Sequence, residues 1–250
     1  MKKKKTVHKV ILMVIGFILA LIFISPILIL VNSSFKSLQE IYLDILALPK
    51  RFSFQNYVKA FEQMDFLKSL INSLVITCVS TVLIILISSM AAWVLVRYKT
   101  KTSKVLFFVF AVAQLIPFQC VMLPLVNVMS KLHLMNRPGL VFMYMGFGCA
   151  MSIILFHGFI KNIPVELEEA ATVAVINAMW IWNDFLLPSL VINKNGMQTL
   201  PLRTYLFFGQ FTKKWDLATA ALVLCMVPIV VFYLSCQKHI VKGITAGVGK

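Results

Sequence analysis

The stretch "NIPVELEEAATVAVINAMWIWNDFLLPSL", residues 162–190, decides which kind of fold the chain adopts. It begins with three carboxylates, at Glu166, Glu168 and Glu169, and runs almost directly into a long apolar segment. That apolar segment carries an acid of its own, Asp184. Charges set against a run of this length suggest the boundary of a membrane span, which the rest of the chain must support.

The composition favours a membrane protein. The 250 residues are 60% hydrophobic, and the mean hydropathy is +0.90. Long uncharged apolar runs are typical of membrane spans, and a soluble domain of this length does not need so much apolar surface. The net charge of +15 would suggest nucleic acid as a partner of a soluble protein. Here the bases lie mostly between apolar runs and no nucleic-acid-binding motif is present, so we expect no nucleic-acid partner.

Six apolar runs divide the chain. The first, 10–32, follows a basic tail at 1–9. It is longer than the apolar region of a signal peptide and no small-residue cleavage site follows it, so we expect an uncleaved helix. A polar segment, 33–66, then leads to a core at 67–236 and a tail at 237–250. The expected spans of the core are 67–96, 105–127, 140–160, 172–193 and 217–236.

The loops predict the orientation. The N-terminal tail, the loop 97–104, the segment 161–171 and the C-terminal tail are short and together hold 13 of the 24 Lys and Arg residues. The remaining 11 are spread over longer segments that also hold five of the acids. Because short loops rich in Lys and Arg stay in the cytoplasm, we expect both termini inside and 33–66 outside the cytoplasm. The predicted fold class is all-α, a polytopic membrane protein with six transmembrane helices.

No arrangement of side chains predicts catalysis. The sequence has no evident nucleophile–base pair and none of the familiar nucleotide-binding loops, and the six spans leave no room for a soluble catalytic domain. The five cysteines lie in or at the ends of apolar runs without metal-ligand spacing, which favours small buried side chains over disulfides or zinc. We therefore expect no enzymatic activity, no cofactor and no metal, and instead a path through the membrane and a docking surface.

Asp184 is the only acid inside an apolar run. An ionised carboxylate in the middle of a span costs on the order of 2.5–3.5 kcal/mol on insertion scales, so it must face protein or water. Asn177 lies seven residues earlier on nearly the same helix face, Asn183 is adjacent, and Trp180 is close by. Asn177, Trp180, Asn183 and Asp184 are therefore candidates for the lining of a solute path. A polar clamp to a neighbouring helix, or a position near the membrane interface, remains open as an alternative.

The acids of 166–169 admit two interpretations. "PVELEEAA" places a proline where a helix can begin and carboxylates in its first turn, where they complement the helix dipole. A solvated helix cap explains this pattern, and composition alone favours it. A short acidic helix facing the cytoplasm, with Ala170 and Ala171 as a close-approach face, would also suit the docking of a partner protein.

A set of motifs in the same order resembles one family, the inner-membrane permease subunits of carbohydrate-importing ABC transporters of the maltose-permease type. "IPVELEEAA" is similar to the start of that family's cytoplasmic EAA motif, with Glu169, Ala170 and Ala171 in the matching positions. Nearly the whole chain takes part, in order. The second span of the family is matched by "NSLVIT" (72–77) and "AAWVLVRY" (91–98). The third span and the loop after it are matched by "LIPFQCVMLPL" (115–125) and "KLHLMNRPGLV" (131–141). The fifth span, its following loop and the tail are matched by "WNDFLLP" (182–188), "TLPL" (199–202) and "HIVKGITAG" (239–247).

The resemblance implies an ABC importer type I permease fold and a set of partners. Such a permease pairs with a second, related permease subunit, cytoplasmic ATPase subunits and an extracytoplasmic solute-binding protein. It forms half of a path for a sugar, by alternating access, and leaves ATP hydrolysis to a partner. The resemblance also implies that Glu166, Glu169, Ala170 and Ala171 belong to the peg that sits in a groove of the ATPase.

The chain departs from the family pattern just after this motif. In the family three residues separate EAA from a glycine, and a second amphipathic helix follows. Here Val175 stands in place of the glycine, and "TVAVINAMW" already has the composition of a membrane span. By this comparison a few tens of residues are missing between about Thr172 and Ala174. We therefore expect the membrane spans to be intact and the coupling to an ATPase to be impaired.

Two other classes of function stay open. A self-sufficient secondary transporter or channel would show internal repeats and paired charges inside the membrane. We find no convincing repeat, and Asp184 has no evident cationic mate inside a span. A membrane scaffold, or an inactive remnant of a permease, is the other alternative.

Overall fold

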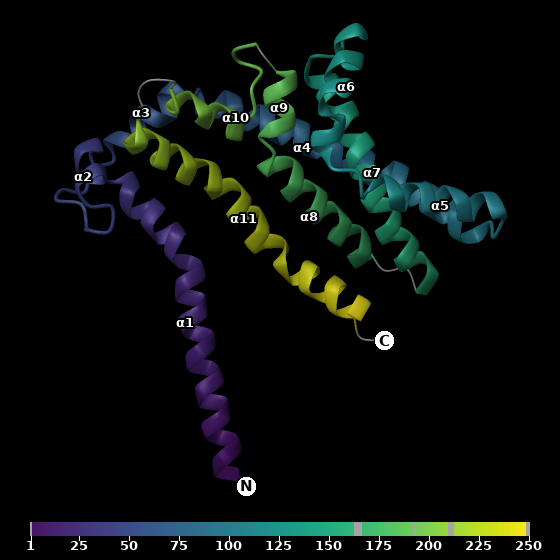
Figure 1. Ribbon diagram of the computed structural model, residues 1–250, viewed down its shortest axis with the longest axis horizontal. Helices are drawn as coiled ribbons and strands as arrows, with labels where there is room; N and C mark the ends of the chain where they lie inside the picture. Colours follow the sequence, from purple (N-terminus) through teal and green to yellow (C-terminus); the bar gives the residue numbers. More distant parts are fainter. Residues whose placement is uncertain (1, 163–166, 193, 210–212, 249–250) are drawn as a thin grey trace. The chain divides into compact units, whose positions relative to one another are not determined.

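The computed structural model describes residues 2–162, 167–192, 194–209 and 213–248, without the side chains of 2–8, 162, 167–169 and 238–248. The residues described are mostly helical and include no strand. Figure 1 shows the helices in chain order, which are α1 Lys2–Ser34, α2 Leu38–Leu43, α3 Gln55–Gln63, α4 Phe66–Arg97, α5 Lys101–Ala113, α6 Phe118–Lys131, α7 Arg137–Asn162, α8 Leu167–Asn183, α9 Leu186–Val191, α10 Leu200–Thr204, the 3₁₀ helix η1 Tyr205–Phe207, and α11 Trp215–Val248.

The chain divides into two compact units. The first unit combines residues 1–64 with 204–224, and the second combines 65–203 with 225–250. Helix α11 therefore contributes its beginning to the first unit and the rest of its length to the second.

The first unit is built on α1. Its apolar part, Lys9–Ser34, is long enough to cross a membrane, and none of its most apolar stretch is buried in the protein. The last carbonyls of a helix have no partner within the helix. Here Asn56 supplies one, because its Nδ2 donates to the carbonyl oxygens of Ser34 (3.0 Å) and Lys36 (2.8 Å). Directly beyond this end, Ser37 and Glu40 form a capping box that starts α2.

Helices α4 and α7 form the centre of the second unit. The buried face of α4 consists largely of small or polar residues three or four positions apart, and such faces let helix backbones approach closely. Gly148 of α7 lies at this contact. A Cβ atom on Gly148 would lie 2.5 Å from Ile84 Cδ1 of α4 and 3.0 Å from Asn177 Oδ1 of α8. The packing of these three helices therefore requires a residue without a side chain at position 148.

Two apolar clusters show how α4, α7 and α8 run. One cluster joins residues from the first half of α4 and of α7 with the end of α8, and it includes Ile76, Tyr144 and Ile181. The other joins the ends of α4 and α7 with the beginning of α8, and it includes Leu95, Phe156 and Val173. Helices α4 and α7 are therefore parallel, and α8 returns antiparallel to them.

The loop before α10 is tied to the beginnings of α4 and α7. The carbonyl oxygen of Gly196 accepts hydrogen bonds from Asn72 Nδ2 of α4 (3.1 Å) and from Arg137 Nη2 of α7 (2.9 Å). Asn72 also donates to the carbonyl of Gln198 (3.0 Å). Gly196 has a φ of +78°, a conformation that glycine adopts without strain.

Four of the six predicted spans are continuous helices. Helices α1, α4, α7 and α11 contain the predicted spans 10–32, 67–96, 140–160 and 217–236, and each has an apolar stretch long enough to cross a membrane.

The expected span at 105–127 is not one continuous helix. Helix α5 ends at Ala113 and α6 begins at Phe118, with a bend of 100° between them. Pro117 explains the break, because proline has no N–H and disfavours the helical conformation of the residue before it, Ile116.

The predicted fifth span, 172–193, is also divided, since α8 ends at Asn183 and α9 begins at Leu186. The helices described include four candidate spans, or five when the bent pair is counted as one, together with the shorter apolar helix Ala170–Asn183. The total of six spans stays a prediction.

Candidate functional site

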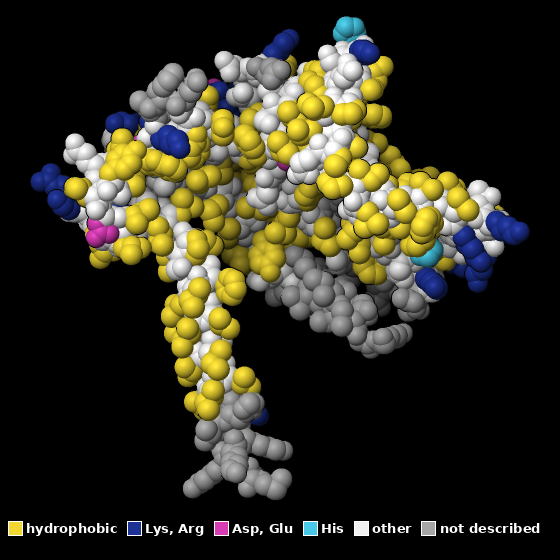
Figure 2. All heavy atoms as spheres, viewed as in Figure 1, with side chains coloured by type: hydrophobic (Ala, Val, Ile, Leu, Met, Phe, Trp, Pro, Cys, Tyr) yellow, Lys and Arg dark blue, Asp and Glu magenta, His cyan; other side chains and the backbone are white. Residues whose placement is uncertain are grey.

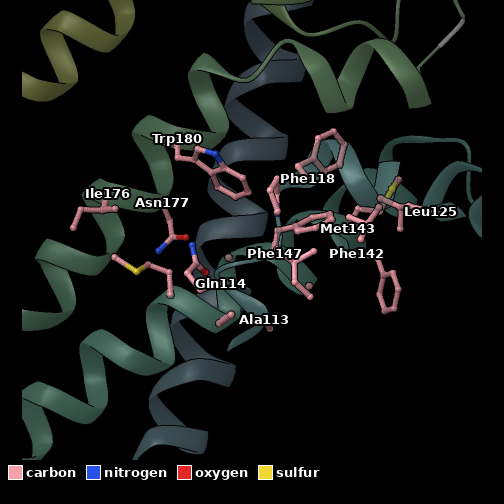
Figure 3. A pocket seen from close by; sticks show the side chains of 17 residues that line it. Ala113, Gln114, Phe118, Leu125, Phe142, Met143, Phe147, Ile176, Asn177 and Trp180 are labelled. Carbon is pink, nitrogen blue, oxygen red and sulfur yellow. The ribbon is translucent and has the colours of Figure 1, made fainter. Parts of the chain in front are cut away.

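A pocket of about 740 Å³ opens between the α5–α6 corner, α7 and α8. Figure 3 shows its lining, in which the carboxamides of Gln114 and Asn177 lie on one side with the indole of Trp180 near them. The rings of Phe118, Phe142 and Phe147 belong to the rest of the wall. An apolar pocket with a few polar groups is the usual form of a small-molecule site. The break before Pro117 makes this pocket possible, because the corner between α5 and α6 forms part of its wall.

Asn177 links α8 to α7 at the wall of the pocket. Its side chain is only 5% exposed, and its Nδ2 donates to Ser152 Oγ of α7 and to the carbonyl of Val173, each at 2.9 Å. Because both Nδ2 protons have acceptors, the amide is held in one orientation. The Asn177 side chain also lines the pocket, so it serves as a fixed polar group in a largely apolar wall.

Trp180 lies one turn further along α8 and contributes an aromatic face. Its side chain is 44% exposed, and its ring meets that of Tyr144 edge to face, with 5.6 Å between ring centroids. Gln114 lies at the end of α5 and is exposed. The pocket therefore combines one exposed indole, one fixed amide and one accessible amide.

Asp184 does not line this pocket; it lies in the break between α8 and α9. Its Oδ2 accepts a hydrogen bond from the Tyr144 hydroxyl of α7 (2.9 Å). Its Oδ1 accepts from the backbone N–H groups of Leu186 (2.9 Å) and Leu187 (3.4 Å) at the start of α9. Asp184 thus binds two N–H groups in the first turn of α9 and fastens the break to α7, which is the geometry of the polar clamp left open by the sequence. Asn183 is exposed and donates to the carbonyl of Met179 (2.8 Å) within α8.

The EAA-like segment is described only in part. Glu166 lies outside the described residues, and Glu169 is described in its backbone alone, within α8. Ala170 and Ala171 are half-buried in the first turn of the apolar helix Ala170–Asn183. Ala170 packs against the cluster formed by the ends of α4 and α7. At least this alanine therefore contacts the protein core.

Sequence reasoning missed three residues that shape the site: Tyr144, Ser152 and Gln114. A signal for Gln114 was present, because it is a polar residue shortly before a proline in an apolar run. Tyr144 and Ser152 gave none, since which face of α7 meets α8 depends on packing between distant segments. No cluster of metal-ligating side chains occurs among the residues that the structure describes.

Comparison with known proteins assigns the family. Residues 84–174 match the family model described as "Binding-protein-dependent transport system inner membrane component". The chain is 42% identical to the probable starch degradation products transport system permease protein of Thermoanaerobacterium thermosulfurigenes, with 99% of each chain covered. It is 32% identical to the multiple sugar-binding transport system permease protein of Streptococcus mutans and 28% identical to the melibiose/raffinose/stachyose import permease protein of Bacillus subtilis, both over the full length of each chain.

A solved structure agrees at the level of the fold. A chain from the crystal structure of a bacterial ABC transporter involved in the import of the acidic polysaccharide alginate superposes with a TM-score of 0.79. The superposition covers 94% of this chain and 97% of that chain at 18% identity. A transporter family of this kind catalyses no reaction of its own, in agreement with the sequence. With a helical membrane fold, a pocket between its helices and relatives aligned from end to end, the chain belongs to the binding-protein-dependent transport system inner membrane components, the permease subunits of ABC importers.

Proposed function

We propose that the chain forms half of the membrane path for a carbohydrate. The observation that carries this proposal is the 42% identity, over 99% of both chains, to a permease named for starch degradation products. Two further relatives aligned over their full length are also named for sugar systems. The transported solute is therefore a sugar or short oligosaccharide, moved by alternating access as the helices rock around a central site.

The pocket suits such a solute. Indole faces stack on the C–H faces of sugar rings, and amide groups exchange hydrogen bonds with their hydroxyls. Trp180 and Asn177 supply these groups at fixed positions, and Gln114 adds a third. In this proposal Asn177 and Trp180 line the path, whereas Asn183 and Asp184 support it by holding the break between α8 and α9 in place.

The partners follow from the family. A second permease subunit completes the path, ATPase subunits bind on the cytoplasmic side, and a solute-binding protein delivers the sugar on the other side. The distribution of Lys and Arg supports both termini, the loop 97–104 and the segment 161–171 on the cytoplasmic side.

Coupling to the ATPase is impaired in this proposal, because the segment after the EAA-like residues is shortened. The alignment with the Thermoanaerobacterium relative spans 272 positions against the 250 residues of this chain, so at least 22 positions face no residue here. The match to the family model ends at residue 174, where the sequence comparison placed the loss. The packing of Ala170 against the core supports the same view, since a peg for an ATPase must protrude.

Co-purification and uptake test the proposal. The chain is co-expressed with a second permease, an ATPase and a solute-binding protein of the same family of transport systems, and the complex is isolated through a tag on this chain. We expect the second permease to co-purify. Uptake of a labelled sugar by the chain alone would identify a secondary transporter, and absence of both partners and transport would identify a remnant.

The path itself is tested by binding of radiolabelled maltooligosaccharide to the purified complex. Trp180→Ala is expected to weaken this binding about 10- to 100-fold, in line with the loss of an aromatic anchor. Trp93→Ala is the matched control, because Trp93 is similarly exposed on α4 but does not line the pocket. Equal effects of the two substitutions would contradict a role of the pocket in the path.

A further inference from the structure

The segment that follows α1 exposes an unusual number of large apolar side chains. Leu43, Leu46, Leu48, Phe52 and Phe54 are between 69% and 80% exposed. Tyr42 and Ile45 are exposed as well, at 67% and 48%. We call these seven residues the apolar belt. In Figure 2 hydrophobic side chains gather over this part of the first unit, with Lys or Arg side chains at its outer margin. Contiguous apolar surface of this kind marks a place where a protein meets a membrane or another protein.

The belt is held in a defined position beside the end of α1. Asn32, in the last turn of α1, donates through Nδ2 to the carbonyl of Ala47 (2.8 Å) and, more weakly, to that of Ile45 (3.4 Å). Lys36 is 1% exposed, and its Nζ donates to the carbonyls of Asp44 (3.0 Å) and Ile45 (2.9 Å). The chain therefore turns back after α2 and lies against the end of the helix it has just left, as Figure 1 shows.

Bonds within the belt region keep this turn compact. The Asp44 carboxylate accepts from the backbone N–H groups of Leu46 (2.9 Å) and Ala47 (3.2 Å). Glu40 accepts from the N–H of Lys50 at 3.0 Å. Because the polar groups of the turn find partners inside it, its apolar side chains are left to face outward.

The depth of this turn follows from the length of α1. The apolar part of α1 has 26 residues, which at 1.5 Å per residue spans about 39 Å. The hydrocarbon core of a bilayer is about 30 Å thick, and headgroups extend it to about 40–45 Å. Ser34 therefore lies in the headgroup region, and the carbonyls of residues 45 and 47, bonded to Asn32, lie at the same depth. A turn anchored there places its exposed leucines within reach of the acyl chains.

We propose that the apolar belt inserts into the membrane interface of the leaflet opposite to the basic N-terminal tail. Leucines and phenylalanines then reach the boundary between acyl chains and headgroups, as in helices that lie in a membrane surface. Tyr42 occupies the depth at which tyrosines are enriched in membrane proteins. Lys50 and Arg51 lie at the headgroups, where phosphate groups bind them. The belt thus fixes the depth of α1, and this role is independent of which solute is transported.

Photocrosslinking from single positions tests the proposal on the full chain in nanodiscs of phosphatidylcholine with phosphatidylglycerol. Benzoylphenylalanine is introduced at Leu46 or at Leu48, at Phe23 inside the span of α1 as a lipid-facing reference, and at Lys59, an exposed residue of α3, as the water-facing control. We expect mass spectrometry to find lipid adducts at positions 46, 48 and 23, and none at position 59.

The remaining outcomes overturn the proposal. Lipid adducts no more frequent at 46 and 48 than at 59, while position 23 reacts, would place the belt in water. Adducts to the solute-binding protein or to the second permease at 46 and 48, once these proteins are added, would identify the belt as a protein-docking surface. Two belt positions are used so that poor folding of one variant does not decide the result.

Discussion

Asp184 shows, at the scale of single residues, how a carboxylate is accommodated inside an apolar segment. One of its oxygens accepts the Tyr144 hydroxyl of α7, and the other accepts two backbone N–H groups at the start of α9. The three donors offset part of the cost of placing a carboxyl group in an apolar segment. The same bonds replace the helical hydrogen bonds that the chain gives up between α8 and α9.

The first prediction concerns the bond between Tyr144 and Asp184. Tyr144→Phe should lower the free energy of unfolding by about 0.5–1.5 kcal/mol, the usual net value of one hydrogen bond. Asp184→Ala should cost about 1–3 kcal/mol, because it also removes the acceptor of two N–H groups at the start of α9 and leaves the buried hydroxyl of Tyr144 without its acceptor. Unfolding in mixed micelles with increasing dodecyl sulfate measures both.

A double-mutant cycle supplies the control. If the bond exists, the double substitution costs less than the sum of the single ones, by about 0.5 kcal/mol or more. Strict additivity would show that the two side chains act independently and that Asp184 is not a clamp.

The sequence left the role of Asp184 open between path lining and a polar clamp, and it did not identify a partner for the clamp. An acid inside an apolar run must have a partner, and the rule that says so does not name the partner. Tyr144 is 40 positions away and lies in a run of large apolar residues from which nothing distinguishes it. For the same reason Asn177 was predicted as path lining, while its bond to Ser152 was beyond prediction.

At the scale of helices, small residues determine how closely the elements pack. The buried face of α4 includes serine, threonine and alanine, and Gly148 on the facing side of α7 has no side chain. In a membrane, such close contact replaces the hydrophobic driving force that packs helices in water. The close contact of these two helices thus requires a residue as small as glycine at position 148.

The second prediction is that Gly148→Ala destabilises the protein by about 1–3 kcal/mol, the usual cost of overpacking. The added methyl group would lie 2.5 Å from Ile84 Cδ1, which can shift, and 3.0 Å from the oxygen of Asn177, whose amide is held by two hydrogen bonds. The same micelle unfolding assay measures the effect.

Gly158→Ala is the matched control on the same helix, because a Cβ atom there would meet nothing within 4 Å. It should be neutral or slightly stabilising, since alanine favours a helix over glycine by up to about 1 kcal/mol. A loss of stability as large at 158 as at 148 would mean that the contact at Gly148 is not the cause.

The helices that the sequence predicted well are those with long uninterrupted apolar runs. For α1, α4, α7 and α11 the long apolar run alone identifies the helix, because a single segment can satisfy all its backbone hydrogen bonds in lipid only as a helix. The break at Pro117 had a visible signal, a proline inside the third run, but proline is tolerated in many membrane helices. The break at Asp184 also had a signal, because Pro188 cannot donate to the carbonyl of Asp184 four residues earlier and its ring crowds that carbonyl. The bonds of the Asp184 side chain, which form only in the folded unit, could not be predicted.

At the scale of the whole molecule, the proposed shortening after Ala171 would separate transport from its source of energy. The chain aligns with two sugar-system permeases over 99% and 100% of their lengths. In the proposed function the ATPase moves the cytoplasmic loops, and a shortened docking segment would transmit less of that movement.

The third prediction follows from this separation. When the complex is reconstituted with its partners, solute-loaded binding protein should stimulate ATP hydrolysis only weakly. Insertion of the corresponding segment of the Thermoanaerobacterium relative between Thr172 and Ala174 should restore stimulation, because it restores the surface that contacts the ATPase. Hydrolysis by the purified complex, with and without loaded binding protein, provides the measurement.

A glycine–serine insertion of equal length at the same position is the control, since it restores length without the contacting helix. Robust stimulation of the chain as it stands, or equal rescue by the glycine–serine insertion, would defeat the idea that a specific coupling surface is missing.

The carbonyl of Gly196 has a consequence for how the second unit can move. This oxygen accepts hydrogen bonds from one side chain at the start of α4 and one at the start of α7, so it links these two helix ends. Two helices that are linked at one end separate more easily at the other end. Any opening between α4 and α7 is therefore expected to begin at the opposite ends of these helices, near Arg97 and Lys161.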